Sequence, residues 1–125
     1  MKENSKELKA YFKGDELAAG VWLGKYALDE EVTPDDMHKR MAKEFAKIEK
    51  KYQRVEKASN LSNYGNDREG LTEDTIYSLF EDFKYVIPQG SIMSTLGTDI
   101  IASLSNCWVE ASPLDSYSGI MHTDA

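Results

Sequence analysis

The chain has 125 residues, of which 41% are hydrophobic and 30% charged, so it can form one folded domain but has little room for a second. Its formal net charge of −7 excludes a protein that follows DNA through the phosphates, since such proteins need clustered Lys and Arg. No stretch approaches the roughly 20 apolar residues of a membrane helix, and the start lacks a secretion signal, so we expect a cytoplasmic protein without a membrane partner.

Two short helices are predicted at the start of the chain. Residues 5–12 form an amphipathic pattern that Gly14 ends, and Asp15 stands where the N-cap of a second helix, residues 16–28, is expected. The second helix is nearly apolar through its middle, so we expect it to be central. Its predicted buried side chains are Leu17, Val21 and Tyr26. The glycines expected to allow a close neighbour are Gly20 and Gly24.

The clearest helix begins at residues 33–36 (TPDD), which combine a hydroxyl N-cap, a proline in the first helical position and acids in the positive first turn. Apolar side chains then recur at spacings of three and four: Met37, Met41, Phe45, Ile48 and Tyr52. Most of the lysines lie on other faces. The pattern predicts a long surface helix with one buried stripe.

A loop and a further helix are predicted next. Residues 57–70 are rich in turn-forming residues, which indicates an exposed connection. Thr72 can cap the following helix, and Pro88 forbids its continuation. The apolar face of this helix comprises Ile76, Leu79, Phe80 and Phe83. Residues 1–88 are therefore interpreted as a helical amino-terminal domain.

The composition changes after Lys84, because the remaining residues include no Lys or Arg and are rich in Gly, Ser, Thr and β-branched residues. Residues 103–110 alternate in the manner of a strand, which cannot satisfy its backbone groups alone. Either residues 92–101 fold back as a hairpin, or the missing strands belong to another polypeptide, and we favour the second. Pro113 and the residues after it predict a turn into a short last helix towards His122.

Few residues carry an obvious chemistry. The chain has neither a phosphate loop nor a dinucleotide-binding glycine motif, and the spacing of His38 and His122 does not suit a shared metal. We predict that both histidines lie on the surface and that the chain holds no metal. Cys107 is the only cysteine, and lone cysteines of cytoplasmic proteins are more often inert core residues than redox nucleophiles.

Three groups of segments resemble the large, catalytic subunit of ribonucleotide reductases. Residues 11–19 (YFKGDELAA) with 25–28 (KYAL), and residues 33–40 (TPDDMHKR) with the helix that follows, are similar to the amino-terminal helical domain of that family. Residues 82–94 (DFKYVIPQGSIMS), leading to 103–107 (SLSNC), resemble the beginning of its catalytic barrel and are the most specific. The resemblance implies a mainly α fold in which residues 89–125 start an incomplete α/β barrel.

The resemblance also implies a chemistry. In that family a protein thiyl radical removes the 3'-hydrogen of a ribonucleotide, and two cysteines become a disulfide as the 2'-hydroxyl leaves. Cys107 stands where the first of these reducing cysteines is expected. The other residues that the resemblance marks are Gly90, Ser91 and Asn106, near the substrate diphosphate and ribose, and Asp115 and Ser116, at the start of the segment that reads an allosteric dNTP.

The family's radical-bearing cysteine, acid-base glutamate and second reducing cysteine have no counterpart in these 125 residues. We therefore expect the isolated chain to be inactive and its partners to be the remainder of the large subunit and a radical-generating small subunit. No cofactor is expected within the chain, whereas the family needs a radical generator, either a metal-containing small subunit or adenosylcobalamin, and a dithiol reductant. Two alternatives remain open, namely a non-catalytic helical remnant that binds a reductase subunit or another protein, and a fragment of a longer gene.

Overall fold

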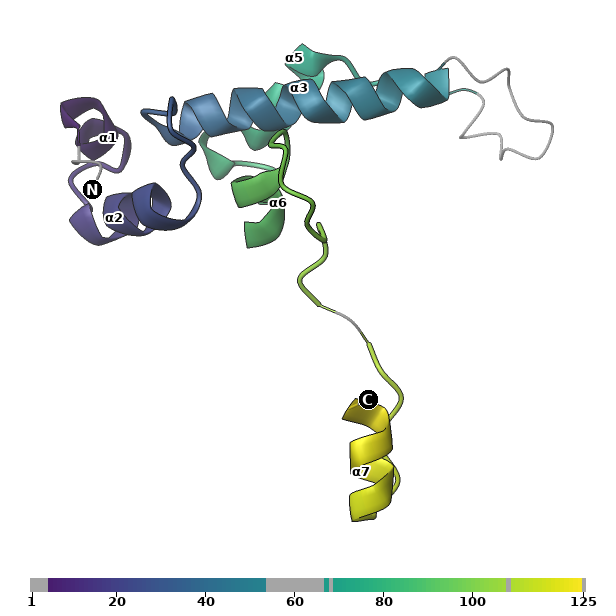
Figure 1. Cartoon of the computed structure of the whole chain (residues 1–125). Coiled ribbons are helices and arrows are strands. Elements are labelled where there is room, and N and C mark those ends of the chain that lie inside the picture. The colour runs from purple at the N-terminus through teal and green to yellow at the C-terminus, as the bar shows by residue number, and fades with distance from the viewer. Residues whose placement is uncertain (1–4, 54–66, 68, 108, 125) are drawn as a thin grey trace.

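The structure, a computed structural model, describes residues 5–53, 67, 69–107 and 109–124. These residues form six α-helices and one 3-10 helix, with no strand among them. The helices up to α6 gather into one body, and an extended segment leads from that body to the last helix, α7 (Figure 1). The mainly α part of the predicted fold class is confirmed, whereas the start of a barrel does not appear in the described residues.

The first two helices begin at side-chain caps, and the cap at Asp15 was predicted. α1 spans Lys6–Tyr11, and the Ser5 hydroxyl accepts a hydrogen bond from the Leu8 N–H at 3.0 Å. α2 spans Glu16–Lys25, and the Asp15 carboxylate accepts from the Ala18 N–H at 2.9 Å. Both bonds satisfy backbone donors that have no partner inside the helix. The chain reverses between the helices at Gly14, whose φ of 88° is readily adopted only by glycine.

The buried face of α2 differs from the prediction. Ala19 and Trp22 are buried, whereas Leu17 is 79% and Val21 40% exposed, and Tyr26 is half-buried. Because α2 is apolar nearly all round, its pattern does not fix which side faces the core, and the large indole ring takes that place. The predicted close approach at Gly20 and Gly24 is also wrong, since a Cβ at either position would meet nothing within 4 Å.

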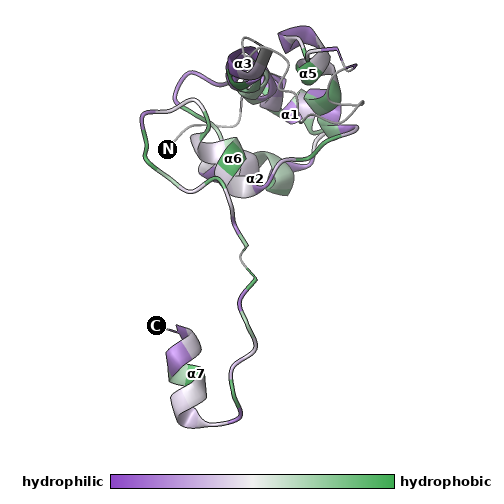
Figure 2. Ribbon diagram, turned by 90° about the vertical axis from the view of Figure 1, so that its right-hand side faces the viewer, coloured by the Kyte–Doolittle hydropathy of each residue, from purple (hydrophilic) through white to green (hydrophobic). Residues whose placement is uncertain are grey.

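α3 spans Pro34–Gln53 and begins where the sequence predicts. Its first turn is held by Asp36, whose carboxylate accepts hydrogen bonds from the Val32 and Thr33 N–H groups, each at 3.0 Å. The predicted stripe is buried at Met37 and Met41, but its later residues Ile48 and Tyr52 are 39% and 68% exposed. Figure 2 shows α3 and α5 side by side over α2 and α6. The stripe is therefore fully buried only in its first half.

α5 spans Glu73–Phe80 and continues into the 3-10 helix η1, Glu81–Phe83. The Thr72 hydroxyl caps α5 by accepting from the Thr75 N–H at 3.2 Å, and Ile76 and Phe80 are buried, as predicted. The helix stops well before Pro88 because Glu81, at ψ 129°, and Asp82, at φ 54°, lie outside the helical region. Most of the predicted loop at residues 57–70 lies outside the described residues.

The segment after Pro88 contains a helix where a hairpin was one expectation. α6 spans Gly90–Thr95, and Met93 and Leu96 are buried in the core that α3 and α5 build. The alternative of a hairpin over residues 92–101 is therefore wrong. The core itself consists of Leu8, Ala19, Trp22, Met37, Met41, Ala42, Ala46, Ile76, Phe80, Met93 and Leu96.

The strand predicted at residues 103–110 is also wrong for the residues that the structure describes there; Trp108 lies outside them. Ser103 and Ser105 bond locally instead, the Ser105 N–H donating to the Ser103 hydroxyl at 3.2 Å. Such side-chain bonds compete with a ladder, and the body offers this segment no strand edge. The described residues from 99 to 118 are all exposed, and α7, Tyr117–Asp124, follows them. The division of the chain at residue 88 stays a prediction.

Candidate functional site

The beginning of α6 meets the segment around Asn106, which is 15 residues further along the chain. The Ser91 hydroxyl donates to the Asn106 Oδ1 atom at 2.6 Å, and the Ser91 N–H lies 3.4 Å from the same oxygen. The Asn106 N–H donates to the Oε1 atom of Gln89 at 3.1 Å. The structure therefore brings together the predicted substrate residues Gly90, Ser91 and Asn106, and Cys107 follows directly.

Gly90 has a packing role in this cluster. A Cβ at Gly90 would lie 3.3 Å from the Cε1 atom of Tyr26, so the glycine lets the start of α6 rest against that ring. Tyr26 follows α2 directly in the chain and is half-buried. The absence of a side chain at Gly90 thus fixes where Ser91 stands relative to the helical body.

Cys107 is exposed, so the common role of a lone cysteine as an inert core residue is wrong for this chain. The backbone carbonyl oxygen of Cys107 accepts a bond from the Ser105 hydroxyl at 3.4 Å. A thiol in this position is reachable by a dissolved reagent or by a second cysteine. It lies next to Asn106, whose Oδ1 atom is engaged by Ser91 and whose Nδ2 group is the donor available to a ligand.

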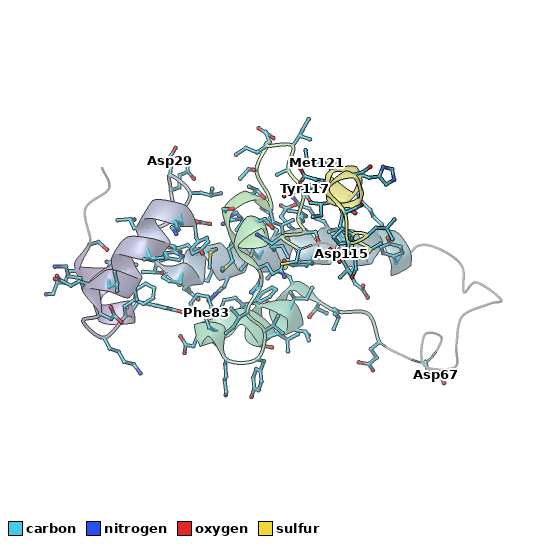
Figure 3. All side chains as sticks on the ribbon, turned by 90° about the horizontal axis from the view of Figure 1, so that it is seen from below. Asp29, Asp67, Phe83, Asp115, Tyr117 and Met121 are labelled. Atoms are coloured by element: carbon cyan, nitrogen blue, oxygen red, sulfur yellow. The ribbon has the colours of Figure 1, made fainter. Side chains whose placement is uncertain are left out.

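The predicted effector residues lie elsewhere. The Ser116 hydroxyl accepts a bond from the Gly119 N–H at 3.0 Å in the first turn of α7. Figure 3 labels Asp115 beside α7, and Figure 1 shows that α7 stands apart from the helical body. The structure therefore separates Asp115 and Ser116 from the Ser91–Asn106 cluster, and it does not test the effector role.

His38 is completely buried, so its predicted surface position is wrong. The ring centroid lies 4.6 Å from that of Phe83 in an edge-on arrangement, and neither ring nitrogen has a hydrogen-bond partner among the described residues. Burial lowers the pKa of His38 and outweighs the nearby carboxylates of Asp35, Asp82 and Glu31. The available signal was its spacing of three and four from the buried Met41 and Ala42. His122 is exposed, as predicted.

Asp35, at the start of α3, is bound by a side chain of α5 and by one of its own helix. The Tyr77 hydroxyl on α5 donates to the Asp35 carboxylate, whose other oxygen lies 2.6 Å from the Lys39 Nζ atom. Burial by itself raises the pKa of Asp35. The hydrogen bonds from Lys39 and Tyr77 together lower it by more, so the pKa lies below its ordinary value. The hydrogen bond to Asp35 raises the pKa of Tyr77. These contacts join α3 to α5.

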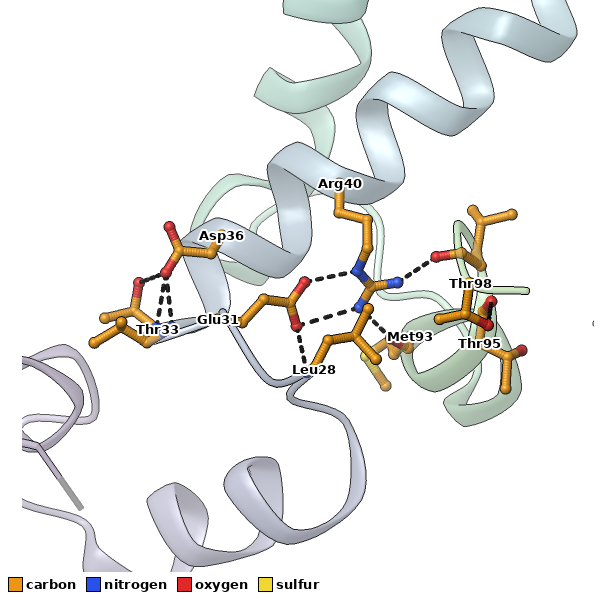
Figure 4. Close-up of polar contacts among 10 residues, drawn as sticks. Leu28, Glu31, Thr33, Asp36, Arg40, Met93, Thr95 and Thr98 are labelled. Atoms are coloured by element: carbon orange, nitrogen blue, oxygen red, sulfur yellow. Dashed lines mark hydrogen bonds and ion pairs between the residues drawn. The ribbon is translucent and has the colours of Figure 1, made fainter. Parts of the chain in front are cut away.

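Arg40 is a functional candidate that the sequence reasoning missed. The Arg40 Nε atom lies 2.6 Å from the Glu31 Oε1 atom, and the two side chains are only 13% and 8% exposed. The guanidinium also donates to the Met93 and Leu96 carbonyl oxygens at the end of α6, the former at 2.7 Å (Figure 4). Its position next to the stripe residue Met41 was the only signal in the sequence.

An apolar groove of about 390 Å³ lies between α3, α5 and the segment that leads to α6. Its lining residues are Phe45, Ile48, Glu49, Tyr52, Leu71, Ile76, Leu79, Phe80, Val86, Pro88 and Ile92. The exposed half of the α3 stripe therefore forms one wall of a groove rather than a solvated face.

Over the described part of the chain, no three His, Cys, Asp or Glu side chains are arranged so that they could hold a metal ion. In the same residues no helix has the length and apolar character that crossing a membrane requires. No family model matches the chain, and no curated protein or solved structure is detectably similar to it.

Proposed function

We propose that this chain is the amino-terminal part of a ribonucleotide reductase large subunit and supplies Cys107 to an active site that another polypeptide completes. The observation that supports the proposal most directly is the 2.6 Å hydrogen bond between Ser91 and Asn106. The two segments that carry the most specific resemblance, residues 82–94 and 103–107, are joined by this bond beside an exposed thiol.

The roles of the residues follow from their chemistry. The Asn106 Nδ2 group is an uncharged donor that suits ribose and phosphate oxygens, and the Ser91 hydroxyl oxygen, whose proton Asn106 accepts, can accept from a ribose hydroxyl. Gly90 seats the start of α6 against Tyr26. Cys107 and a second cysteine on the partner polypeptide each give up one proton and one electron as they join in a disulfide. The ribonucleotide loses its 2'-hydroxyl as water and gains hydrogen at that carbon. A radical generator, either a metal-containing small subunit or adenosylcobalamin, starts the reaction.

The resemblance also suggests how the assembled enzyme is regulated and where it works. Asp115 and Ser116 contribute to a dNTP effector site in the assembled enzyme. The large-subunit remainder is the required partner, a dithiol restores the cysteine pair, and the assembly works in the cytoplasm. The isolated chain is inactive because the residues that carry the radical and transfer protons belong to its partner.

The test is reconstitution of the 125-residue chain with the rest of a cognate large subunit and its radical generator. Deoxynucleotide formation from a ribonucleotide with a dithiol reductant is expected for the wild type and is expected to disappear with Cys107→Ser. Ser78→Ala, which removes a hydroxyl that bonds to the Thr75 carbonyl oxygen within its own helix, is the control and should keep most of the activity. Dithiol-driven turnover by the Cys107→Ser protein would show that the cysteine has another role.

The apolar groove favours a second candidate function, a non-catalytic helical module that binds a reductase subunit. Ile48, 39% exposed, and Val86, 40% exposed, line this groove, and an apolar helix of a partner would cover them. In that case the chain would co-purify with the subunit without restoring activity, and Ile48→Asp would abolish co-purification. Recovery of activity on mixing would remove this candidate.

A further inference from the structure

We propose that Arg40 and Glu31 are positioning residues for the site at the start of α6. The inference rests on the proposed function and adds two residues to it, neither of which touches the substrate. It follows from four features of the structure, namely a buried ion pair, two bonds to the far end of α6, a glycine that makes room for the arginine, and the bonds at the near end of α6.

The ion pair joins α3 to the connection between α2 and α3. Glu31 accepts from the Arg40 Nε atom at 2.6 Å through Oε1, and its Oε2 atom accepts from the Leu28 N–H at 2.8 Å. Both Glu31 oxygens therefore hold the guanidinium, since Oε2 also lies 3.4 Å from Arg40 Nη2, and Oε2 holds its own loop as well (Figure 4). A buried charge that lost this partner would be strongly unfavourable, so the pair keeps the guanidinium in one place.

The remaining guanidinium donors hold the end of α6. The Arg40 Nη2 atom donates to the Met93 carbonyl oxygen at 2.7 Å, and Nη1 donates to that of Leu96. The last carbonyl groups of a helix have no partner within the helix and carry its negative dipole end, so a cation is favourable there. A planar fork of donors reaches two carbonyls and a carboxylate at once, which an ammonium group cannot do.

Gly97 shows how closely the chain fits around this arginine. A Cβ at Gly97 would lie 3.2 Å from the Arg40 Cγ atom and 2.9 Å from the Glu44 Cγ atom, and its φ of 85° is unfavourable for other residues. The chain therefore turns away from α6 directly over the arginine stem. A side chain there would displace the side chains of Arg40 and Glu44.

α6 connects the arginine to the proposed site. The helix has only six residues, its carboxyl end is bound by Arg40, and its amino end carries Ser91. Two side chains also bond back along it, the Ser94 hydroxyl to the Gly90 carbonyl at 2.9 Å and the Thr95 hydroxyl to that of Ser91. A short helix braced in this way moves as a unit, so a displacement at Met93 and Leu96 shifts the Ser91 hydroxyl away from Asn106.

The test uses the full chain carrying Arg40→Lys, which keeps the positive charge but loses the fork. Amide hydrogen exchange is measured first, on the chain alone. The amides of residues 91–96 are expected to exchange about tenfold faster in the variant, while those of α1 stay as in the wild type. Lys9→Met, which removes the exposed Lys9–Glu16 ion pair at 2.9 Å, is the matched control and should leave α6 unchanged. Unchanged exchange over residues 91–96 in a folded Arg40→Lys protein would overturn the proposal.

Kinetics with the reconstituted enzyme provide the second readout. A positioning role predicts that Arg40→Lys raises KM for the ribonucleotide by about tenfold with a smaller change in kcat, since ground-state contacts are misplaced while Cys107 stays intact. A loss of stability alone would reduce kcat in proportion to the unfolded fraction and leave KM unchanged, which would also overturn the proposal. Glu31→Gln, which keeps the shape of the pair, is expected to produce an intermediate KM and serves if Arg40→Lys fails to fold.

The failure of the proposed function is distinguishable from the failure of this inference. If the wild-type chain gives no deoxynucleotide with its partner, the reductase assignment is lost. Hydrogen exchange on the isolated chain then still decides whether Arg40 holds α6 and the Ser91–Asn106 contact in place.

Discussion

The Ser91 hydroxyl and the Asn106 side-chain oxygen, 15 residues apart in the sequence, lie 2.6 Å from each other and join α6 to the exposed segment that carries Cys107. This contact is exposed to solvent, so its contribution to overall stability is small. The contact orders this segment locally, because the described residues from 99 to 118 are all exposed and have no buried side chains to hold them.

Ser91→Ala tests that contact directly. The substitution is expected to change the chemical shifts of the Asn106 side-chain amide and to speed exchange of the Asn106 N–H, as seen by NMR. The free energy of unfolding should change by less than about 1 kcal/mol because the bond is exposed. Ser78→Ala is the control, since that hydroxyl bonds only to the Thr75 carbonyl oxygen within its own helix, at 2.8 Å. Unaltered Asn106 signals would contradict the contact.

The pKa of His38 predicts a pH dependence of stability. Burial lowers this pKa in the folded chain, so below the usual value of about 6.5 the unfolded state binds more protons than the folded state. Stability is therefore expected to fall as the pH is lowered from about 6.5, by at most about 1.4 kcal/mol per pH unit. Urea unfolding between pH 7 and pH 5 measures this fall. His38→Leu should abolish it, whereas the exposed His122→Gln should not.

Two leucines of neighbouring helices provide a matched test of the core. Leu8 is 1% exposed and belongs to the core, whereas Leu17, which the sequence predicted as buried, is 79% exposed. Leu8→Ala is expected to lower the free energy of unfolding by about 2–5 kcal/mol through lost burial and a cavity. Leu17→Ala should change it by less than about 0.5 kcal/mol. Chemical denaturation compares them, and equal costs would contradict the observed face of α2.

Substitution by alanine is predicted to change the stability of the fold in opposite directions at two glycines. Gly97→Ala meets an unfavourable φ of 85° and the side chains of Arg40 and Glu44, so it is expected to destabilise the fold by about 1–3 kcal/mol. Gly20 lies inside α2 with open space around it, so Gly20→Ala should stabilise by about 0.5–1 kcal/mol through reduced backbone entropy. Thermal unfolding of both variants checks the sign of each change.

Local chemistry was sufficient to predict where α1, α2, α3 and α5 begin, whereas the start of α6 at Gly90 was missed. Ser5, Asp15 and Thr72 each accept a bond from a backbone N–H three residues ahead, a relationship that depends only on nearby residues. The start at Pro34 follows from the same kind of local preference. The resemblance assigned Ser91, Asn106 and Cys107 to one substrate site, which stays a prediction, and the structure shows Ser91 and Asn106 in contact.

Tertiary packing decided the rest. Three features depend on which element packs against each helix: the inward face of α2, the burial of His38 and the contacts of Arg40. These neighbours are far away in the sequence, so the local pattern does not reveal them. The alternation over residues 103–110 predicted a strand, but a strand exists only when a second edge supplies its hydrogen bonds. The sequence by itself determined the starts of α1, α2, α3 and α5, because their signals are local, whereas α6, the buried faces and the missing strand were determined by contacts between distant residues.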